Sequence, residues 1–154
     1  MDEVMKPEEQ KTIIEWANLN YHRFQKNGPG RQFCQFRELP DVPECVYTIR
    51  ERIVQREKLH GVMQEPLLTD YIGYIQDGGQ IHPHIDRNRG DLIHTRFNVF
   101  VQLPEKGGMP VYNDETIQVK ERSYIICCAG LHKHYCEKVE GSKARIILSY
   151  GFLK

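Results

Sequence analysis

The pattern of hydrophobic and polar positions divides the chain into a helical part and a β part. Up to about residue 60 the apolar residues recur at helical spacing. The first such stripe consists of Ile13, Trp16, Ala17, Tyr21 and Phe24. Gly28-Pro29-Gly30 follows it, and a Gly-Pro-Gly run ends a helix. The pattern therefore predicts a first helix that ends before residue 28.

A second helix is predicted over residues 43–59. Asp41 can cap its N-terminus, and Pro43 suits its first turn. Its apolar stripe is made of Val46, Ile49, Ile53 and Val54. Gly61 lies just past its end, which is where glycine commonly follows a helix.

From about residue 68 the hydrophobic period changes to two, which is typical of strands. The predicted strands are 69–76, 80–86, 95–103, 109–113, 116–119, 123–129 and 144–152. Turn residues such as Asp77-Gly78-Gly79 and Lys106-Gly107-Gly108 separate them. Many short strands at regular spacing predict a mainly β sandwich or barrel. Two of the strands look apolar on both faces, so we expect the N-terminal helices to pack on one sheet. We interpret residues 1–154 as a single domain, with a helical cover over 1–62 and a β core over 68–152.

Composition and charge remove several classes of function. Lys plus Arg and Asp plus Glu both number 21, so bulk charge gives no reason to expect nonspecific binding to nucleic acid. No apolar run approaches the roughly 20 residues of a membrane span. Met1-Asp2-Glu3 does not resemble a secretory signal, so we expect a cytoplasmic protein. The five cysteines form no C-x-x-C pair, which argues against a zinc ribbon or a disulfide framework.

Two short clusters hold four of the seven histidines: His82-Pro83-His84-Ile85-Asp86 and His132-Lys133-His134. Residues i and i+2 of a strand point the same way, so His84 and Asp86 can reach one metal ion. His134 can supply a third ligand. Two imidazoles and one carboxylate on one face of an ion leave the other face open, which suits non-heme Fe(II) and O2. The lack of thiolate ligands disfavours a structural zinc site.

Arg145 opens the last predicted strand, on which Arg145, Ile147 and Ser149 are expected to share one face. A buried arginine is costly unless it meets an anion, and its planar fork fits a carboxylate. The distal carboxylate of 2-oxoglutarate is such a partner.

The order His84-x-Asp86, His134, Arg145 resembles the iron/2-oxoglutarate oxygenase superfamily over residues 69–152. The resemblance implies a double-stranded β-helix, which is a jelly-roll or cupin-like fold. It also implies a metal triad of His84, Asp86 and His134, with Arg145 binding the cosubstrate. The implied cofactors are Fe(II), 2-oxoglutarate and O2.

Within the superfamily the chain is most similar to the aspartyl/asparaginyl β-hydroxylase branch. The stretches that carry this likeness are 78–84, 96–104, 112–116 and 134–145. It implies that Arg96 and Asn98 help to hold the cosubstrate, Asn98 standing where the branch has histidine. The chain departs from the branch at Gly73, where a serine can contact the cosubstrate, and at Asp86, which the animal members lack. We also expect Ser149 and Tyr74 to line the cosubstrate pocket.

Several assignments have alternatives. His82 could replace His84 in an H-x-H metal pair, and His132 could replace His134. The remaining histidines (His22, His60 and His94) belong to no cluster and are expected to be solvated or core residues. Arg87 and Arg89 follow the H-x-D pair, and we predict either recognition of an acidic substrate group or a solvated loop.

The sequence thus predicts a 2-oxoglutarate-dependent dioxygenase that hydroxylates an amino-acid side chain and releases succinate and CO2. The expected substrate is a free or peptidyl aspartyl, asparaginyl or prolyl group. The alternatives are an oxidative nucleic-acid demethylase, which the neutral charge disfavours, and a non-catalytic cupin-like binding module. A zinc hydrolase would need a general base beside the metal, and the sequence shows no candidate.

Overall fold

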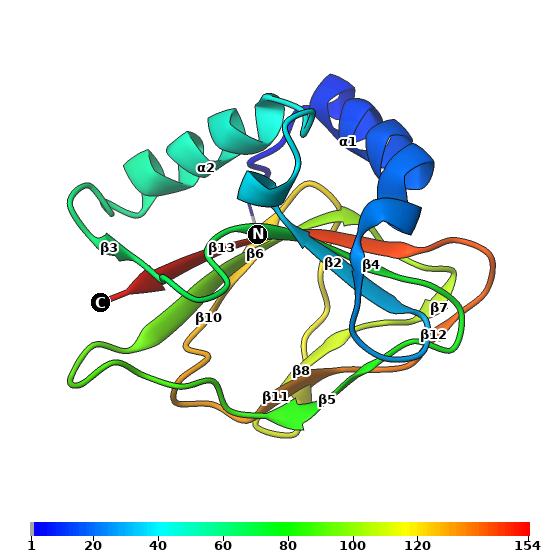
Figure 1. Ribbon diagram of the computed structural model, residues 1–154. Coiled ribbons are helices and arrows are strands. Elements are labelled where there is room, and N and C mark those ends of the chain that lie inside the picture. Colours follow the sequence, from blue (N-terminus) through cyan, green and yellow to red (C-terminus); the bar gives the residue numbers. More distant parts are fainter. Residues whose placement is uncertain (1) are drawn as a thin grey trace.

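In the computed structural model, which describes residues 2–154, two helices lie over a large curved sheet and a smaller sheet lies beneath it (Figure 1). The helices are α1 (Pro7–Asn20) and α2 (Cys45–Arg56). Short 3-10 turns follow at Tyr21–Arg23 and precede α2 at Phe36–Glu38. Neither α1 nor α2 has the length and apolar character needed to cross a membrane.

All strand pairs in the described residues are antiparallel. The strands are β1 (Gln25–Lys26), β2 (Arg31–Gln35), β3 (Met63–Gln64), β4 (Tyr71–Ile75), β5 (Ile81–His84), β6 (His94–Gln102), β7 (Lys106–Gly107), β8 (Pro110–Tyr112), β9 (Glu115–Thr116), β10 (Tyr124–Cys127), β11 (His134–Cys136), β12 (Val139–Glu140) and β13 (Arg145–Leu153). The large sheet has the order β1-β2-β4-β13-β6-β10, with β3 paired to β13. The smaller sheet has the order β5-β11-β8-β9, and β12 pairs with β7. The prediction of a mainly β fold is confirmed.

The hydrophobic core lies between the helices and the large sheet. On β13 the residues Ile146, Leu148, Tyr150 and Phe152 belong to it, together with the predicted stripe of α2. Tyr150 is fully buried, and its hydroxyl donates a 2.6 Å hydrogen bond to the Val46 carbonyl. The alternation predicted for β13 is therefore confirmed, and it leaves the other face of this strand turned toward the smaller sheet.

The helical interpretation of residues 1–60, with a break at Gly28-Pro29-Gly30, missed two strands between the helices. β1 and β2 form there and extend the large sheet at β4. Gln32 and Cys34 point toward the helices, and the Gln32 amide donates to the Tyr21 carbonyl at 2.8 Å. The inward-facing Gln32 is polar, and a hydrogen bond satisfies its buried amide. The strand therefore lacks the alternation of apolar and polar residues that would have predicted it.

An ion pair fixes α1 against α2. Arg52 donates from both terminal nitrogens to the carboxylate of Glu9, at 2.7 and 2.8 Å. Burial opposes the charge on Glu9, but the bonds to Arg52 and to the Lys6 backbone, together with the positive charges of both residues, outweigh it and lower the pKa of Glu9.

We expect Glu9→Gln to lower the free energy of unfolding at pH 7 by about 1–2 kcal/mol. A lowered pKa in the folded state gives stability that is present above the ordinary value and lost as the pH falls through the folded value. Urea unfolding from pH 7 to pH 3 measures this: the difference between wild type and variant should shrink as Glu9 becomes protonated. A constant difference across this range would contradict the role of the pair.

Candidate metal centre

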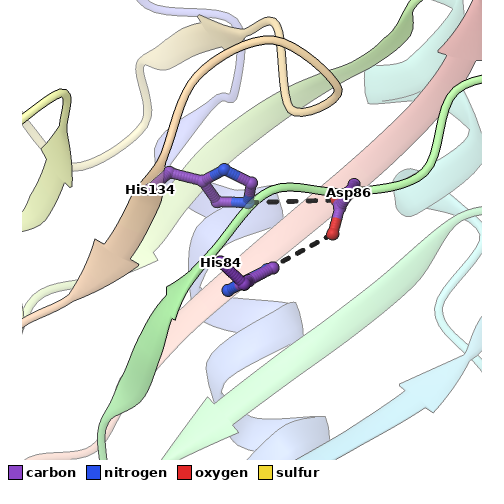
Figure 2. A group of neighbouring side chains, drawn as sticks. All are labelled: His84, Asp86 and His134. Atoms are coloured by element: carbon purple, nitrogen blue, oxygen red, sulfur yellow. Dashed lines mark ion pairs between the residues drawn. The ribbon is translucent and has the colours of Figure 1, made fainter.

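His84, Asp86 and His134 come together where β5 ends and β11 begins. β5 pairs with β11, and His84 lies directly opposite His134. The potential ligand atoms of the three residues lie within 4.8 Å of one another. His84 Nε2 is 3.3 Å from Asp86 Oδ1, and His134 Nε2 is 3.9 Å from Asp86 Oδ2 (Figure 2). One strand pair and the turn after β5 therefore collect three donor atoms around one point.

Both imidazoles are held in the same way. Nδ1 of His84 lies 2.8 Å from the carbonyl oxygen of His82, and Nδ1 of His134 lies 2.8 Å from that of His132. A carbonyl oxygen only accepts, so each Nδ1 carries a proton, and Nε2 is the ring nitrogen that would bind a metal ion. Metal-binding histidines are usually oriented by this kind of bond. His82 and His132 thus contribute backbone carbonyls, and their imidazoles lie outside the three-residue group.

The charges of the group fit a divalent cation. Burial opposes ionisation of Asp86, but the bond to His84 and the neighbouring imidazoles lower its pKa. The bond to Asp86 raises the pKa of His84, and burial lowers that of His134. The site therefore offers one carboxylate and two imidazole nitrogens without a thiolate. This donor set suits non-heme iron better than a structural zinc ion.

A cavity of about 620 Å³, counted with its open mouth, lies between the two sheets and includes the three residues. Its wall also carries Arg145, Asn98 and Tyr112, with apolar surface from Ile147 and Leu68. Ser149 is buried behind Asn98 and donates a 2.7 Å bond to its Oδ1. Asn98 in turn donates from Nδ2 to the Tyr112 hydroxyl at 3.4 Å. The wall next to the metal group is thus polar and ordered.

Arg145 is the strongest sign of a ligand in this cavity. It is only 4% exposed. Its Nε donates to the Gly108 carbonyl at 2.7 Å, while its Nη1 is buried without a hydrogen-bond partner. A buried, unpaired guanidinium nitrogen is costly, about 1–3 kcal/mol or more for a charged group. An anion in the cavity would satisfy it.

Arg96 has partners other than those expected. Its Nη2 bonds to Glu65 at 2.8 Å, its Nη1 to the Thr69 carbonyl at 2.5 Å, and its Nε to His94 at 3.0 Å. Glu65 also accepts from the backbone of residues 67–69. Gly151 makes room, since a Cβ there would lie 2.6 Å from the Arg96 guanidinium carbon. Arg96 touches the cavity wall, but its charge is compensated by Glu65 and holds the loop before β4.

The prediction that Tyr74 lines the cosubstrate pocket is wrong. Its hydroxyl donates to Asn18 of α1 at 2.8 Å, and its ring stacks on Tyr21 at 4.8 Å. Adjacent strand residues face opposite sides, so Gly73 and Ile75 face the space between the sheets and Tyr74 faces the helices.

Arg87 and Arg89 do not line the cavity: both are exposed, and Arg89 points its Nη1 at the Met63 sulfur, 3.8 Å away.

The sequence analysis missed two other residues at the site. Arg31 of β2 lines the cavity, but its segment lies between the two predicted helices and no strand was predicted there. His94 places Nδ1 3.7 Å from Asp86 Oδ2 and accepts from Arg96 on Nε2. Its sequence neighbours carry no metal-site signal, so only the fold reveals it.

Asn88 joins the two loops that carry the metal group. Its Nδ2 donates to the Gly130 carbonyl at 3.0 Å, and its Oδ1 accepts from the His94 backbone at 2.9 Å. A Cβ at Gly130 would fall 1.5 Å from that Oδ1, so only glycine fits there. Asn88 therefore sets the distance between the turn after Asp86 and the turn before His134.

We expect Asn88→Ala to weaken binding of Mn(II), used in place of Fe(II), by about 10-fold, because supporting contacts of this kind are worth about 10–100-fold in metal affinity. Gly130→Ala should have a similar effect, since it displaces the same side chain. Titration followed by electron paramagnetic resonance measures both. Wild-type Mn(II) affinity in both variants would show that the link does not position the ligands.

Comparison with known proteins gives a fold and no family. No protein-family model matches the chain, and no curated protein sequence does. Among solved structures, a viral collagen prolyl hydroxylase from Paramecium bursaria Chlorella virus-1, in complex with 2-oxoglutarate, has a TM-score of 0.68 at 16% identity, covering 99% of this chain and 92% of the other. A prolyl-4-hydroxylase from Pseudomonas putida has a TM-score of 0.67 at 12% identity, covering 100% and 90%. The chain therefore shares its fold, along almost its whole length, with these two proteins.

Proposed function

We propose that this chain is an Fe(II)- and 2-oxoglutarate-dependent dioxygenase that hydroxylates an amino-acid side chain, with release of succinate and CO2. One observation carries the proposal: a buried arginine with an unsatisfied donor shares a cavity with a group of two histidines and one aspartate. This pairs a metal site with a carboxylate site. The shared fold with prolyl hydroxylases, one of them a 2-oxoglutarate complex, supports the same chemistry.

The residues have separate tasks in this proposal. His84 and His134 bind the iron through Nε2, and Asp86 binds it through a carboxylate oxygen. When bound, the iron and 2-oxoglutarate together supply the oxidation by O2. Arg145 binds the far carboxylate of 2-oxoglutarate and so fixes the direction in which the cosubstrate lies. Asn98 and Tyr112 form the wall of the cavity between Arg145 and the metal ligands. Ser149 holds Asn98 in place, and burial raises the pKa of Tyr112, so its phenol is neutral.

The finer assignment concerns the substrate. We propose a free or peptidyl amino-acid side chain, with aspartyl, asparaginyl and prolyl groups as candidates. The likeness of residues 78–84 and 134–145 to the aspartyl/asparaginyl β-hydroxylase branch and the prolyl hydroxylase neighbours both support an amino-acid target. The balanced charge of the chain gives no support to a nucleic-acid substrate.

The test is iron-dependent turnover of 2-oxoglutarate. We expect the protein loaded anaerobically with Fe(II) to form succinate after exposure to O2, and N-oxalylglycine to inhibit this. A panel of peptides and free amino acids bearing Asp, Asn or Pro, followed by mass spectrometry, should then show the gain of one oxygen atom. Iron-loaded protein that forms no succinate with any of them would favour a non-catalytic cupin-like module.

A further inference from the structure

Two guanidinium groups lie in one row across the large sheet. Arg31 of β2 pairs with Ile75 of β4, and Arg145 of β13 pairs with the same Ile75 from the other side. Strands lie about 4.8 Å apart, so the two arginine Cα atoms are separated by roughly 10 Å. Residues paired across neighbouring strands share a face, and here that face is turned toward the smaller sheet. Both side chains accordingly line the cavity.

The two arginines also lie at the end of the cavity that extends away from the metal group. A second hollow of about 430 Å³ adjoins it, and Arg31 and Arg145 line both. None of His84, Asp86 and His134 reaches this second hollow. A ligand that starts at the metal group and extends past Arg145 would therefore meet Arg31 as well.

The charge of Arg31 has no compensating partner among residues 2–154. Its guanidinium makes no hydrogen bond or ion pair there, although the residue is half-buried. Burial lowers the pKa of Arg31, and the nearby charge of Arg145 acts in the same direction. Among the described residues that line the two hollows, Asp86 is the only one with a carboxylate, and Arg96 already pairs with Glu65 behind the wall. An anion that enters the cavity would therefore meet two positive charges that no nearby carboxylate neutralises.

The backbone at Arg31 is fixed before any ligand arrives. Gly30 has a φ of 68°, and its carbonyl accepts from Gln76 at 2.7 Å. A Cβ on Gly30 would lie 2.9 Å from the Gly79 nitrogen, so the chain enters β2 in close contact with the turn after β4. Phe33, on the same face of β2, packs on Tyr71 with ring centroids 5.9 Å apart. The start of β2 is thus a rigid support for the side chain.

We propose that Arg31 is a second carboxylate-binding residue of this cavity and that it holds the far carboxylate of 2-oxoglutarate together with Arg145. This inference rests on the proposed function, and it adds a residue on a different strand to the cosubstrate site. A carboxylate between two guanidinium groups accepts bonds on both oxygens, so the pair selects a dianionic 2-oxo acid over a monoanionic one.

The test compares two ligands that differ only in this carboxylate. 2-Oxopentanoate has a methyl group where 2-oxoglutarate has its far carboxylate. Binding of each to the Mn(II)-loaded protein is measured for wild type, Arg31→Gln, Arg31→Lys and Arg145→Gln. We expect Arg31→Gln to weaken the binding of 2-oxoglutarate by about 10-fold or more, because the variant removes a charged donor to the far carboxylate. Binding of 2-oxopentanoate should stay within about 2-fold, and Arg31→Lys should recover part of the loss.

Lys26→Gln is the matched control, because it removes one exposed positive charge from the neighbouring strand β1 without touching the cavity. It should leave both ligands unaffected. Equal losses for both ligands in Arg31→Gln would overturn the inference, and so would unchanged 2-oxoglutarate binding with a loss of substrate oxidation, which would assign Arg31 to the substrate. If Arg145→Gln alone discriminates between the ligands, the proposed function stands and this inference fails. If wild type does not prefer 2-oxoglutarate, the proposed function fails first.

Discussion

Replacing Asp86 by alanine is expected to abolish succinate formation, with a loss of at least about 100-fold. The variant keeps the two imidazoles of the group but loses its carboxylate. Two neutral ligands bind a divalent ion far more weakly than two imidazoles and a charged oxygen. Mn(II) affinity and succinate formation should therefore fall together. His134→Ala should behave in the same way, because His134 supplies the donor from the opposite strand.

The fold should survive the Asp86 substitution. The backbone N–H of Asp86 donates to the Ala129 carbonyl at 2.8 Å, and this bond does not depend on the side chain. Asp91→Ala is a suitable control, since Asp91 is exposed on the same loop and outside the metal group. Thermal unfolding should then be similar for all three proteins. An Asp86→Ala protein that binds Mn(II) and turns over 2-oxoglutarate at the wild-type rate would refute the ligand assignment.

The second large effect is expected for Arg145→Gln, which should raise the 2-oxoglutarate concentration needed for half-maximal turnover by roughly 30-fold or more. Removing one partner of a buried, hydrogen-bonded charge pair costs about 2–5 kcal/mol. Because Arg145 lies across the cavity wall and is not one of the three metal residues, Mn(II) affinity should stay close to that of wild type. A loss of 2-oxoglutarate binding without a loss of Mn(II) binding would distinguish a role in holding the cosubstrate from a general disruption of the site.

Stability gives a further check on Arg145. In the ligand-free protein its Nη1 is buried without a partner, so its loss removes a desolvation cost along with the bond to Gly108. We therefore expect Arg145→Gln to unfold at nearly the wild-type temperature, although its requirement for 2-oxoglutarate is much higher. An unchanged dependence of rate on 2-oxoglutarate would exclude the anchoring role.

Local patterns predicted much of the fold. The stripe of α2 and the alternation of β13 depend on residues close in sequence, so periodicity identified both. The strand β2 was not predicted because its segment is short and polar. Its strand conformation depends on pairing with β4, which lies some 40 residues later. The prediction for Tyr74 was wrong for a related reason. Because β4 is buried on both faces, its composition does not reveal which residues face the cavity.

The candidate site shows the same division. The spacing of His84 and Asp86 on one strand end is a local property, and the sequence could predict that they meet. The partnership of Arg96 with Glu65 joins residues 31 positions apart in sequence, and nothing in either segment indicates it. Arg31 enters the cavity only because β2 adds to the edge of β4. Contacts that the topology creates are thus the ones that sequence patterns missed.

Backbone carbonyl groups orient His84 and His134, and this affects which substitutions the site can accept during evolution. Each imidazole is aimed by the peptide oxygen two residues before it, which any amino acid provides. The first histidine of each H-x-H run is therefore interchangeable as far as ligand orientation is concerned, and drift at positions 82 and 132 leaves the aim of the ligands intact. A search for distant homologues of this centre should accordingly compare the backbone conformation of residues 82–84 and 132–134. It should give no weight to the identity of residues 82 and 132.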